Sequence, residues 1–456
     1  MRGHRSSRIL VAGKDARTDA IAAALAASPQ TGELYALSEL HNPPGLLRVC
    51  KELRHGSLTD LDWMESATRD IAPDLVVVGP EEPLAAGYVN RLDEMGILAF
   101  GPPSELAEIE SSKAWARELL AKYNIPGNPE HRAFASAKSL REYMEELGDF
   151  VVKPDGLTAG KGVKVFGEHL HSIDEALAYA LDVLRTHPRV LIEERLEGEE
   201  FSLQTITDGD AVMHCPLVQD HKRAFEGDRG PNTGGMGSYS CADFSLPFLG
   251  DADVLQAHTI SEKVISALAS ETGRPYKGVL YGGFISTSDG IRLIEYNARF
   301  GDPEAMNVLP ILDADFAEIC FAVAEGKLGK VDWSFQPRAT VCKYVVPEAY
   351  PQKSEPTKLG ITPAELDKFG ATWYWAACEQ HGEDILMTSS RTGAFVGSGD
   401  SLHKAEAAAE QAAQELQRGR SIRYRGDIGT EPLIRKRIEH MQKLRGSQFR
   451  PHASQY

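Results

Sequence analysis

Short apolar runs alternate with longer helical patterns over the first hundred residues. The runs RILVAG, DLVVVGP and ILAFGP all consist of apolar residues that lead into a glycine. Continuous apolar runs of this length are typical of strands buried on both faces, and strands that alternate with helices form parallel sheets. The pattern predicts a doubly wound α/β domain over residues 1–104, with one wall of a ligand cleft where its strands end.

The rest of the chain shows mixed α+β patterning in two further regions. Residues 105–330 contain a predicted helix in SSKAWARELLAKYNIP and two strands, GVLYGGFIS and IRLIEYN, joined by a turn as a hairpin. Residues 331–456 contain several strand-like runs, a helix with alanine on one face, a final helical stretch from about residue 438 and a polar tail. We therefore predict three domains, with boundaries near residues 104 and 330.

Composition narrows the class of protein. The 456 residues are 42% hydrophobic, and no run of about 18 apolar residues or signal-peptide cleavage region is present. We therefore expect a soluble, cytoplasmic protein. The six cysteines are scattered without metal-ligand spacing, so we expect buried thiols. A net charge of -17 disfavours nucleic acid as a partner but leaves room for a local basic pocket that binds a nucleotide.

The segment VVKPDGLTAGKGVKV places two lysines and three glycines between apolar strands. Glycines allow backbone N–H groups to approach anionic oxygens, and Lys153 and Lys161 add positive charge. The segment therefore predicts a lid that closes on phosphates through Gly156, Gly160 and Gly162. The alternative is a tight hairpin without a ligand.

Two acidic segments follow at strand ends. In RVLIEERLEGEEFS, a strand that leaves the core at Glu194 to Leu196 can read an adenine edge, and Glu200 can hold ribose hydroxyls. The alternative is a solvated acidic turn. In IRLIEYNARFGDPE, Glu295 and Asn297 alternate along a strand, so both can face one cation, and hard oxygen ligands suit Mg²⁺. An ordinary polar strand end is the alternative there.

The segment QDHKRAFEGDRGPNTGGMGSY is too polar and too rich in glycine to form a core. A loop that orders around an anionic substrate would explain its charges and its glycines, whereas the alternative is a mobile surface loop. Its candidate substrate-binding residues are Asp220, His221, Lys222, Arg223, Asn232, Thr233, Gly234 and Gly235.

Together these segments resemble the ATP-grasp superfamily and, within it, the phosphoribosylamine-glycine ligase family of purine biosynthesis. The resemblance covers nearly the whole chain, and the QDHKR to PNTGGMG segment is its most family-specific piece. It implies a preATP-grasp domain, an ATP-grasp domain with a flexible lid subdomain over about 124–192, and a small C-terminal α+β domain. Other matching pieces are GPEEPL, SSKAWARELL, VVKPDGLTAGKGV, GVLYGGFI, EYNARFGDPE and YRGDIG.

The resemblance also implies an activity and its ligands. The reaction would join glycine to 5-phosphoribosylamine with ATP and Mg²⁺ or Mn²⁺, through a glycyl phosphate, in a monomer or weak homo-oligomer without nucleic-acid or membrane partners. Arg299 would stabilise the intermediate, and Asp302 would help to hold glycine and the amine, so these two residues and Lys153 would be catalytic. ATP would contact Lys113, Lys153, Gly156, Gly160, Lys161, Gly162, Glu193, Glu194, Leu196, Glu200 and Phe284.

One loop departs from the family pattern. Where the family has a GxGGREHA-like loop after its first strand, this chain has GKDARTDA, in which only Gly13, Arg17 and Ala20 fit. Asp15 places negative charge where a sugar phosphate is expected, and Lys14 is the candidate to offset it. Gly13 and Arg17 remain candidate substrate-binding residues. Two alternatives stay open: a ligase for another carboxylate and amine, and an ATP-binding protein without turnover.

Overall fold

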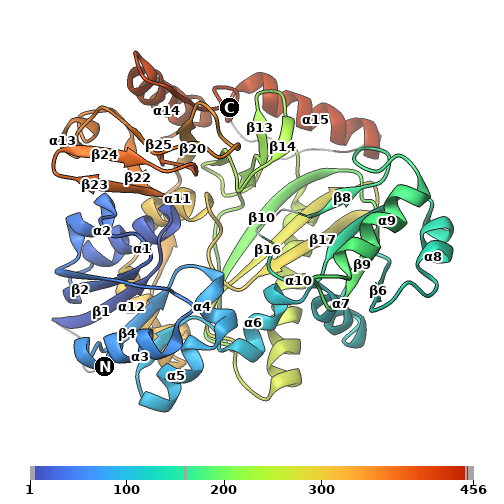
Figure 1. The fold of residues 1–456 in the computed structure, drawn as a ribbon, viewed down its shortest axis with the longest axis horizontal. Coiled ribbons are helices and arrows are strands. Elements are labelled where there is room, and N and C mark those ends of the chain that lie inside the picture. The colour runs from blue at the N-terminus through green and yellow to red at the C-terminus, as the bar shows by residue number, and fades with distance from the viewer. Residues whose placement is uncertain (1–5, 159–161, 447–448, 450–456) are drawn as a thin grey trace.

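A computed structural model describes residues 6–158, 162–446 and 449. The N-terminal part forms a parallel sheet covered by helices, drawn in blue in Figure 1. The apolar strand β1 lies at its centre, and the predicted doubly wound α/β fold is confirmed. In spatial order the strands are β3 (Glu52–His55), β2 (Thr31–Ser38), β1 (Ser7–Ala12), β4 (Leu75–Val78) and β5 (Leu98–Phe100). The helices are α1 (Ala16–Ala26), α2 (Pro44–Val49), α3 (Leu61–Ile71), α4 (Glu81–Ala86) and α5 (Tyr88–Met95).

The middle of the chain forms an antiparallel sheet against which α10 packs. The predicted hairpin is present as β16 and β17, but its pairing shifts by one residue, because Gly283 faces Glu295 whereas Phe284 faces Leu293. A bulge of this kind bends a strand locally and changes the direction of its side chains. The sheet order is β11 (Val212–His214), β10 (Glu199–Thr207), β16 (Gly278–Thr287) and β17 (Gly290–Asn297). The helices around it are α6 (Ser104–Ser111), α7 (Lys113–Lys122) and α10 (Asp251–Thr272).

A second antiparallel sheet forms a subdomain with its own apolar core, at the right of Figure 1. Phe150, Val152 and Ile192 lie in this core and are fully buried. The subdomain therefore has a core separate from those of the neighbouring sheets. Its elements are β6 (His131–Phe134), β9 (Val190–Glu194), β7 (Phe150–Pro154), β8 (Lys164–Val165), α8 (Leu140–Leu147) and α9 (Ile173–Val183).

The C-terminal sheet includes two strands from the middle of the sequence. β15 pairs with β20, and β12 pairs with the other edge of β15. The segment around residues 219–240 therefore lies beside the C-terminal part of the chain in space. The alanine-rich helix α14 covers β20 and β25. The sheet order is β12 (Gln219–Asp220), β15 (Gly237–Ser240), β20 (Ala339–Pro347), β25 (Gly393–Gly399) and β22 (Thr372–Trp375), and β26 (Ile422–Arg423) also pairs with β20.

The remaining elements surround these sheets. The final helix begins at Glu431 rather than near residue 438, because Thr430 and Pro432 provide a favourable helix start. Small sheets are formed by β13 (Arg223–Phe225) with β14 (Arg229–Asn232), β18 (Leu312–Asp313) with β19 (Ser334–Phe335), and β21 (Thr357–Lys358) with β24 (Asp384–Met387) and β23 (Cys378–His381). The other helices are α11 (Ala305–Val308), α12 (Phe316–Glu325), α13 (Pro363–Leu366), α14 (Leu402–Gln417) and α15 (Glu431–Arg445). Short 3₁₀ helices span Leu309–Ile311 and Leu328–Lys330.

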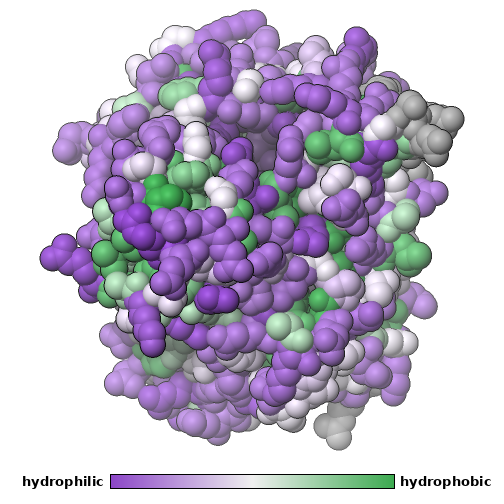
Figure 2. Space-filling view, turned by 90° about the vertical axis from the view of Figure 1, so that its right-hand side faces the viewer, coloured by the Kyte–Doolittle hydropathy of each residue, from purple (hydrophilic) through white to green (hydrophobic). Residues whose placement is uncertain are grey.

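The surface and the cysteines agree with the composition. Polar side chains dominate the face shown in Figure 2, where apolar groups form only small, scattered patches. Within the described residues, no helix has the length and apolar character that a membrane span requires. Five of the cysteines are buried thiols and Cys50 is half-buried, and none of the six forms a disulfide.

Candidate active site

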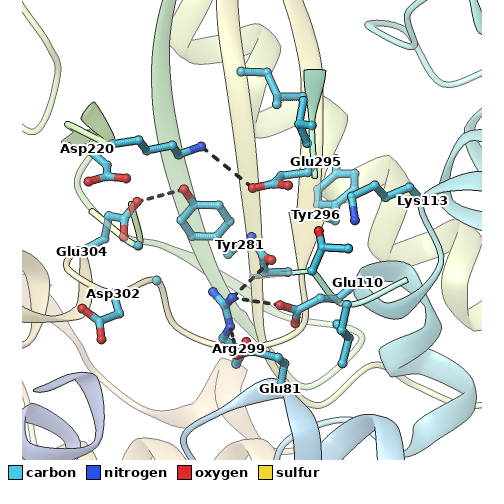
Figure 3. A pocket seen from close by; sticks show the side chains of 18 of the residues that line it. Glu81, Glu110, Lys113, Asp220, Tyr281, Glu295, Tyr296, Arg299, Asp302 and Glu304 are labelled. Carbon is cyan, nitrogen blue, oxygen red and sulfur yellow. Dashed lines mark hydrogen bonds and ion pairs between the residues drawn. The ribbon is translucent and has the colours of Figure 1, made fainter. Parts of the chain in front are cut away.

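A cavity of about 350 Å³ lies where the three parts of the chain meet. The loops that follow β1 and β4 form one wall, the end of β17 forms another, and the loop before β25 closes the C-terminal side. A second cavity of about 390 Å³ adjoins the first, and Lys153, Glu200 and Lys222 line both. The two cavities therefore form one cleft, and Figure 3 shows the first of them.

Lys153 belongs to a buried ionic cluster at the junction of the two cavities. Its Nζ lies 2.5 Å from Glu193 Oε2, and Arg117 holds the same carboxylate with two hydrogen bonds of 2.6 and 3.1 Å. Burial alone would raise the pKa of Glu193, but Arg117 and Lys153 outweigh burial and hold it at about 2. Two cations thus share one carboxylate, so positive charge remains for an anionic ligand.

Lys113 connects the helical body to the glycine-rich lid. Its Nζ donates to the Gly156 carbonyl at 2.8 Å, and Asp155 accepts hydrogen bonds from Ser112 and from the Ala114 backbone. Gly156, Leu157 and Thr158 line the first cavity, and Tyr179 donates to the Gly162 carbonyl. The predicted ligands Gly160 and Lys161 lie outside the described residues. The lid thus begins beside both lysines predicted to meet phosphates.

The second cavity combines several apolar side chains with a mostly charged and polar lining. Val151, Val165, Ile285 and Ile294 line it together with Glu194 to Leu196 and Glu200. Glu193 also lines this cavity, although its carboxylate is bound within the ionic cluster. Apolar side chains beside the end of a strand can hold a base between them.

The prediction for Phe284 is corrected by the structure. Phe284 is fully buried and packs on Phe201 and Tyr296, so it belongs to the core. Its neighbour Ile285 lines the second cavity, whereas Phe284 does not. The pleat of β16 explains the difference, because successive side chains point to opposite faces.

Glu295 and Asn297 both line the first cavity at the end of β17. Lys222 Nζ lies 3.9 Å from Glu295 Oε1, and Arg299 donates to Asn297 Oδ1 at 3.3 Å. One carboxylate and one amide oxygen fit Mg²⁺, which commonly takes few protein ligands and completes its shell with phosphate oxygens and waters. Within the described part of the chain, no cluster of three or more His, Cys, Asp or Glu residues could hold a metal by itself.

Arg299 lies between two carboxylates in the first cavity (Figure 3). Its Nε donates to Glu81 Oε2 at 2.9 Å, and its Nη2 lies 2.9 Å from Glu110 Oε1. Burial raises the pKa of Glu110 to about 7, whereas Arg299 and Arg17 overcome burial at Glu81 and hold its pKa at about 2. The two carboxylates thereby fix the orientation of the guanidinium in the cavity wall.

The 220–235 loop brings some of its predicted residues to the first cavity and others elsewhere. Asp220, Lys222, Asn232, Thr233 and Gly234 line that cavity. Burial raises the pKa of Asp220, and the nearby charge of Glu304 raises it further. Burial would lower the pKa of Lys222, but the carboxylates around it outweigh burial and raise that pKa. Gly235 needs the absence of a side chain, because its φ is +106° and a Cβ would lie 2.7 Å from Asp220 Oδ1.

His221 and Arg223 take part in contacts that position the loop. The His221 ring is buried against Tyr239, and its Nδ1 lies 3.5 Å from Asp228 Oδ1. Arg425, from the YRGDIG motif, lies 3.0 Å from the same carboxylate oxygen, and Arg223 pairs with Glu168 on the lid. His221 and Arg223 both line the second cavity. The contact of Asp228 with Arg425 connects the β13–β14 segment to the C-terminal part, and the pair of Arg223 with Glu168 connects it to the lid.

The altered N-terminal loop gives Asp15 a structural role. Its carboxylate caps α1 by accepting from the Thr18 backbone N–H at 2.9 Å, and it pairs with Arg17. Arg17 also donates to the Phe300 carbonyl at 2.8 Å. Asp15 and Arg17 line the first cavity, whereas Gly13 packs against Thr18, where a Cβ would overlap the side chain. The charge of Asp15 is thus neutralised within the protein.

Replacing Asp15 with asparagine is expected to destabilise the protein in a pH-dependent way. Burial would raise the pKa of Asp15, but Arg17 and the hydrogen bonds from Thr18 hold it at about 2, below its ordinary 3.8. Because the pKa of Asp15 is lower in the folded state, the ionised carboxylate adds about 2 kcal/mol to the free energy of unfolding. This contribution is fully present above about pH 4 and is lost as the pH falls towards 2. Urea unfolding over a pH series should show the gap between wild type and D15N narrowing below pH 4. A constant gap would contradict the ion pair, and D15A, which also loses the cap, should be less stable than D15N at neutral pH.

Sequence reasoning missed several residues of the first cavity. Glu81 follows the Gly-Pro pair after β4, and Glu304 lies in the GDPE motif beyond β17, so a strand end and a motif were the available signals. Glu304 accepts a hydrogen bond from Tyr281 at 2.8 Å. Glu110 and Arg391 also line the cavity, but their local sequence carries no comparable signal.

The fold and cleft are those of an ATP-grasp protein. Residues 111–305 match the family model described as the phosphoribosylglycinamide synthetase ATP-grasp (A) domain, and residues 7–110 match the N domain of the same family. A crystal structure of biotin carboxylase from Campylobacter jejuni shares the fold, with a TM-score of 0.70, 14% identity and coverage of 98% of this chain and 97% of that chain.

Known relatives define the family within that class. The phosphoribosylamine–glycine ligase of Methanopyrus kandleri is 45% identical over 96% of this chain and 99% of its own length. That of Methanocaldococcus jannaschii is also 45% identical, over 96% and 100%. The crystal structure of the Thermotoga maritima ligase has a TM-score of 0.74 at 25% identity and covers 92% of this chain and 100% of that one. The chain belongs to the phosphoribosylglycinamide synthetase family, whose curated members are named phosphoribosylamine–glycine ligases.

Proposed function

We propose that this chain is an ATP-dependent ligase that joins glycine to 5-phosphoribosylamine, giving glycinamide ribonucleotide, ADP and phosphate. The observation that carries the proposal is the convergence of Lys153, Glu295, Arg299 and the 220–235 loop on one cleft. Membership of the family supports the choice of substrates. A carboxylate is a poor electrophile, so ATP is the reactant that activates it.

The proposed chemistry has two steps. A carboxylate oxygen of glycine attacks the γ-phosphorus of ATP, ADP leaves, and glycyl phosphate forms. The amine of phosphoribosylamine then attacks the carbonyl carbon, the C–N bond forms, phosphate leaves, and the nitrogen loses a proton. Neither step needs a protein nucleophile, so the protein acts through positioning and charge stabilisation.

The residues of the cleft have distinct proposed roles in these steps. Lys113 and Lys153 bind the phosphates, while Glu194 to Leu196 and Glu200 bind the adenosine part in the second cavity. Arg299 stabilises charge on the acyl phosphate, and closure of the lid excludes water from it. The 220–235 loop and Asp302 hold glycine and the amine. Mg²⁺ or Mn²⁺ bound by Glu295 and Asn297 would neutralise charge on the transferring phosphoryl group.

Formation of the product tests the proposal directly. Purified protein with ATP and Mg²⁺ should release ADP when glycine and freshly generated phosphoribosylamine are supplied together, with glycinamide ribonucleotide identified by mass. Either substrate supplied alone should give only background release. ATP binding without turnover of this pair would reject the proposed substrates and direct the search to other carboxylates and amines.

Replacing Glu295 with glutamine is expected to abolish the part of ATP-dependent stabilisation that requires Mg²⁺. A ligand at one hundred times its Kd raises the free energy of unfolding by about 2.7 kcal/mol, which shifts Tm by several degrees. The shift in Tm with ATP, with and without Mg²⁺, should collapse to the metal-free value in E295Q. Glu262→Gln, which removes a half-exposed carboxylate near His214, is the control and should behave as wild type. An unchanged Mg²⁺-dependent shift in E295Q would exclude Glu295 as a ligand.

A further inference from the structure

Arg391 reaches the first cavity from the C-terminal part of the chain, beyond both segments that match the family models. It lies just before β25, and its Nη1 donates to the Gly234 carbonyl at 2.6 Å and to the Gly235 carbonyl at 3.0 Å. Its Nη2 lies 3.2 Å from Asp302 Oδ2. One guanidinium thus connects the substrate loop to the segment that follows β17.

The surroundings of Arg391 fix its orientation. The guanidinium lies 4.2 Å from the centre of the Tyr344 ring on β20, and Tyr344 donates a hydrogen bond to Asp302 Oδ1. The Arg391 side chain is 15% exposed and that of Asp302 is 8% exposed, so the pair is largely removed from water. Partly buried hydrogen bonds to a charged group are stronger than exposed ones, and the planar guanidinium can hold several acceptors in fixed directions.

The position of these contacts separates Arg391 from the nucleotide side of the cleft. Figure 3 shows Asp302, Glu304 and Asp220 on one side of the cavity and Lys113 on the other. The candidate phosphate ligands contact other residues: Lys113 donates to the Gly156 carbonyl, and Lys153 donates to Glu193. A change at Arg391 therefore acts first on the part of the cavity that is left for the smaller substrates.

We propose that Arg391 is a positioning residue that holds the Asn232–Gly235 turn and Asp302 in the geometry that binds the two non-nucleotide substrates. It acts through these groups, since its guanidinium donates to the Gly234 and Gly235 carbonyls and forms an ion pair with Asp302. The C-terminal part of the chain thereby sets affinity for the substrates that are joined, while the ATP-grasp part binds the nucleotide. This inference rests on the proposed function.

The test compares Arg391→Ala and Arg391→Lys with Arg420→Ala. Arg420 is a matched control, because its guanidinium also donates to backbone carbonyls, of Gly360 and Leu416, but outside the cleft. In R391A we expect KM for glycine, for the amine or for both to rise about tenfold or more, with the Kd for Mg²⁺-ATP within about twofold of wild type. R391K should be intermediate, and millimolar guanidinium should partly restore R391A.

Hydrogen exchange provides a second measurement that does not require turnover. The amides of Thr233, Gly235 and Met236 are hydrogen-bonded within the loop. They should exchange faster in R391A and in R391K than in wild type and R420A. Unchanged KM values or unchanged exchange would overturn the inference, as would an equal loss of Mg²⁺-ATP affinity. Lack of turnover by the wild-type protein would instead reject the proposed function, and the exchange measurement would still decide the role of Arg391.

Discussion

Replacing Arg299 with methionine is expected to lower kcat by at least about a hundredfold while leaving the Kd for Mg²⁺-ATP nearly unchanged. Removing one preorganised donor to developing charge typically costs two to three orders of magnitude in kcat. Arg299 is held for such a role, because Glu81 and Glu110 fix its guanidinium from two directions. R299K should also be strongly impaired, since an ammonium group lacks the geometry to bridge both carboxylates while facing the substrate.

Pre-steady-state ADP formation and equilibrium nucleotide binding measure the two sides of this prediction. Arg274 offers a matched control, because it bridges Asp93 and Glu105 at the surface, outside the cleft. R274M should therefore keep wild-type kcat. If R299M retained more than a tenth of the wild-type kcat, Arg299 would be a structural bridge rather than the group that stabilises the intermediate.

The periodicity of the sequence was sufficient to predict the local architecture. The buried runs at β1, β4 and β5 gave a parallel sheet, and the alternation in IRLIEYN placed Glu295 and Asn297 on the same face. Strand alternation depends only on neighbouring residues, so a single sequence contains the information. The role of Phe284 was instead carried over from the family resemblance, and the structure places that side chain in the core.

Contacts between distant segments were not predictable from a single sequence. Arg299 meets Glu81 across 218 positions, and Arg391 meets Gly234 across 157. The pairing of β15 with β20 likewise brings the 219–240 segment to the C-terminal sheet. A local pattern of polar and apolar positions shows where a charged residue stands in its own element. It does not show which distant residue that charge will contact. The site was therefore predicted as a set of motifs, while the structure adds the positioning residues that connect them.

Replacing Glu193 with glutamine is expected to destabilise the folded protein by about 3–5 kcal/mol, because two buried cations lose their shared carboxylate. The side chains of Arg117 and Glu193 are each 3% exposed, and that of Lys153 is 10% exposed. The free energy of unfolding in urea measures the loss. Glu271→Gln is the control, since Glu271 pairs at the surface with Lys122, which lies on α7 as Arg117 does, and it should cost less than about 1 kcal/mol.

A triple variant separates the structural part of this cluster from its functional part. Combining Arg117→Met, Lys153→Met and Glu193→Leu removes all three charges, and apolar replacement of a buried ionic cluster is often neutral or stabilising. The triple variant should regain much of the stability lost in E193Q, although the Ile294 carbonyl loses its donor from Arg117. It should still lack the rise in Tm with Mg²⁺-ATP, because Lys153 is absent. Regained stability together with that ATP-dependent rise would show that the cluster serves the fold alone, whereas regained stability without it would assign its charge to the nucleotide.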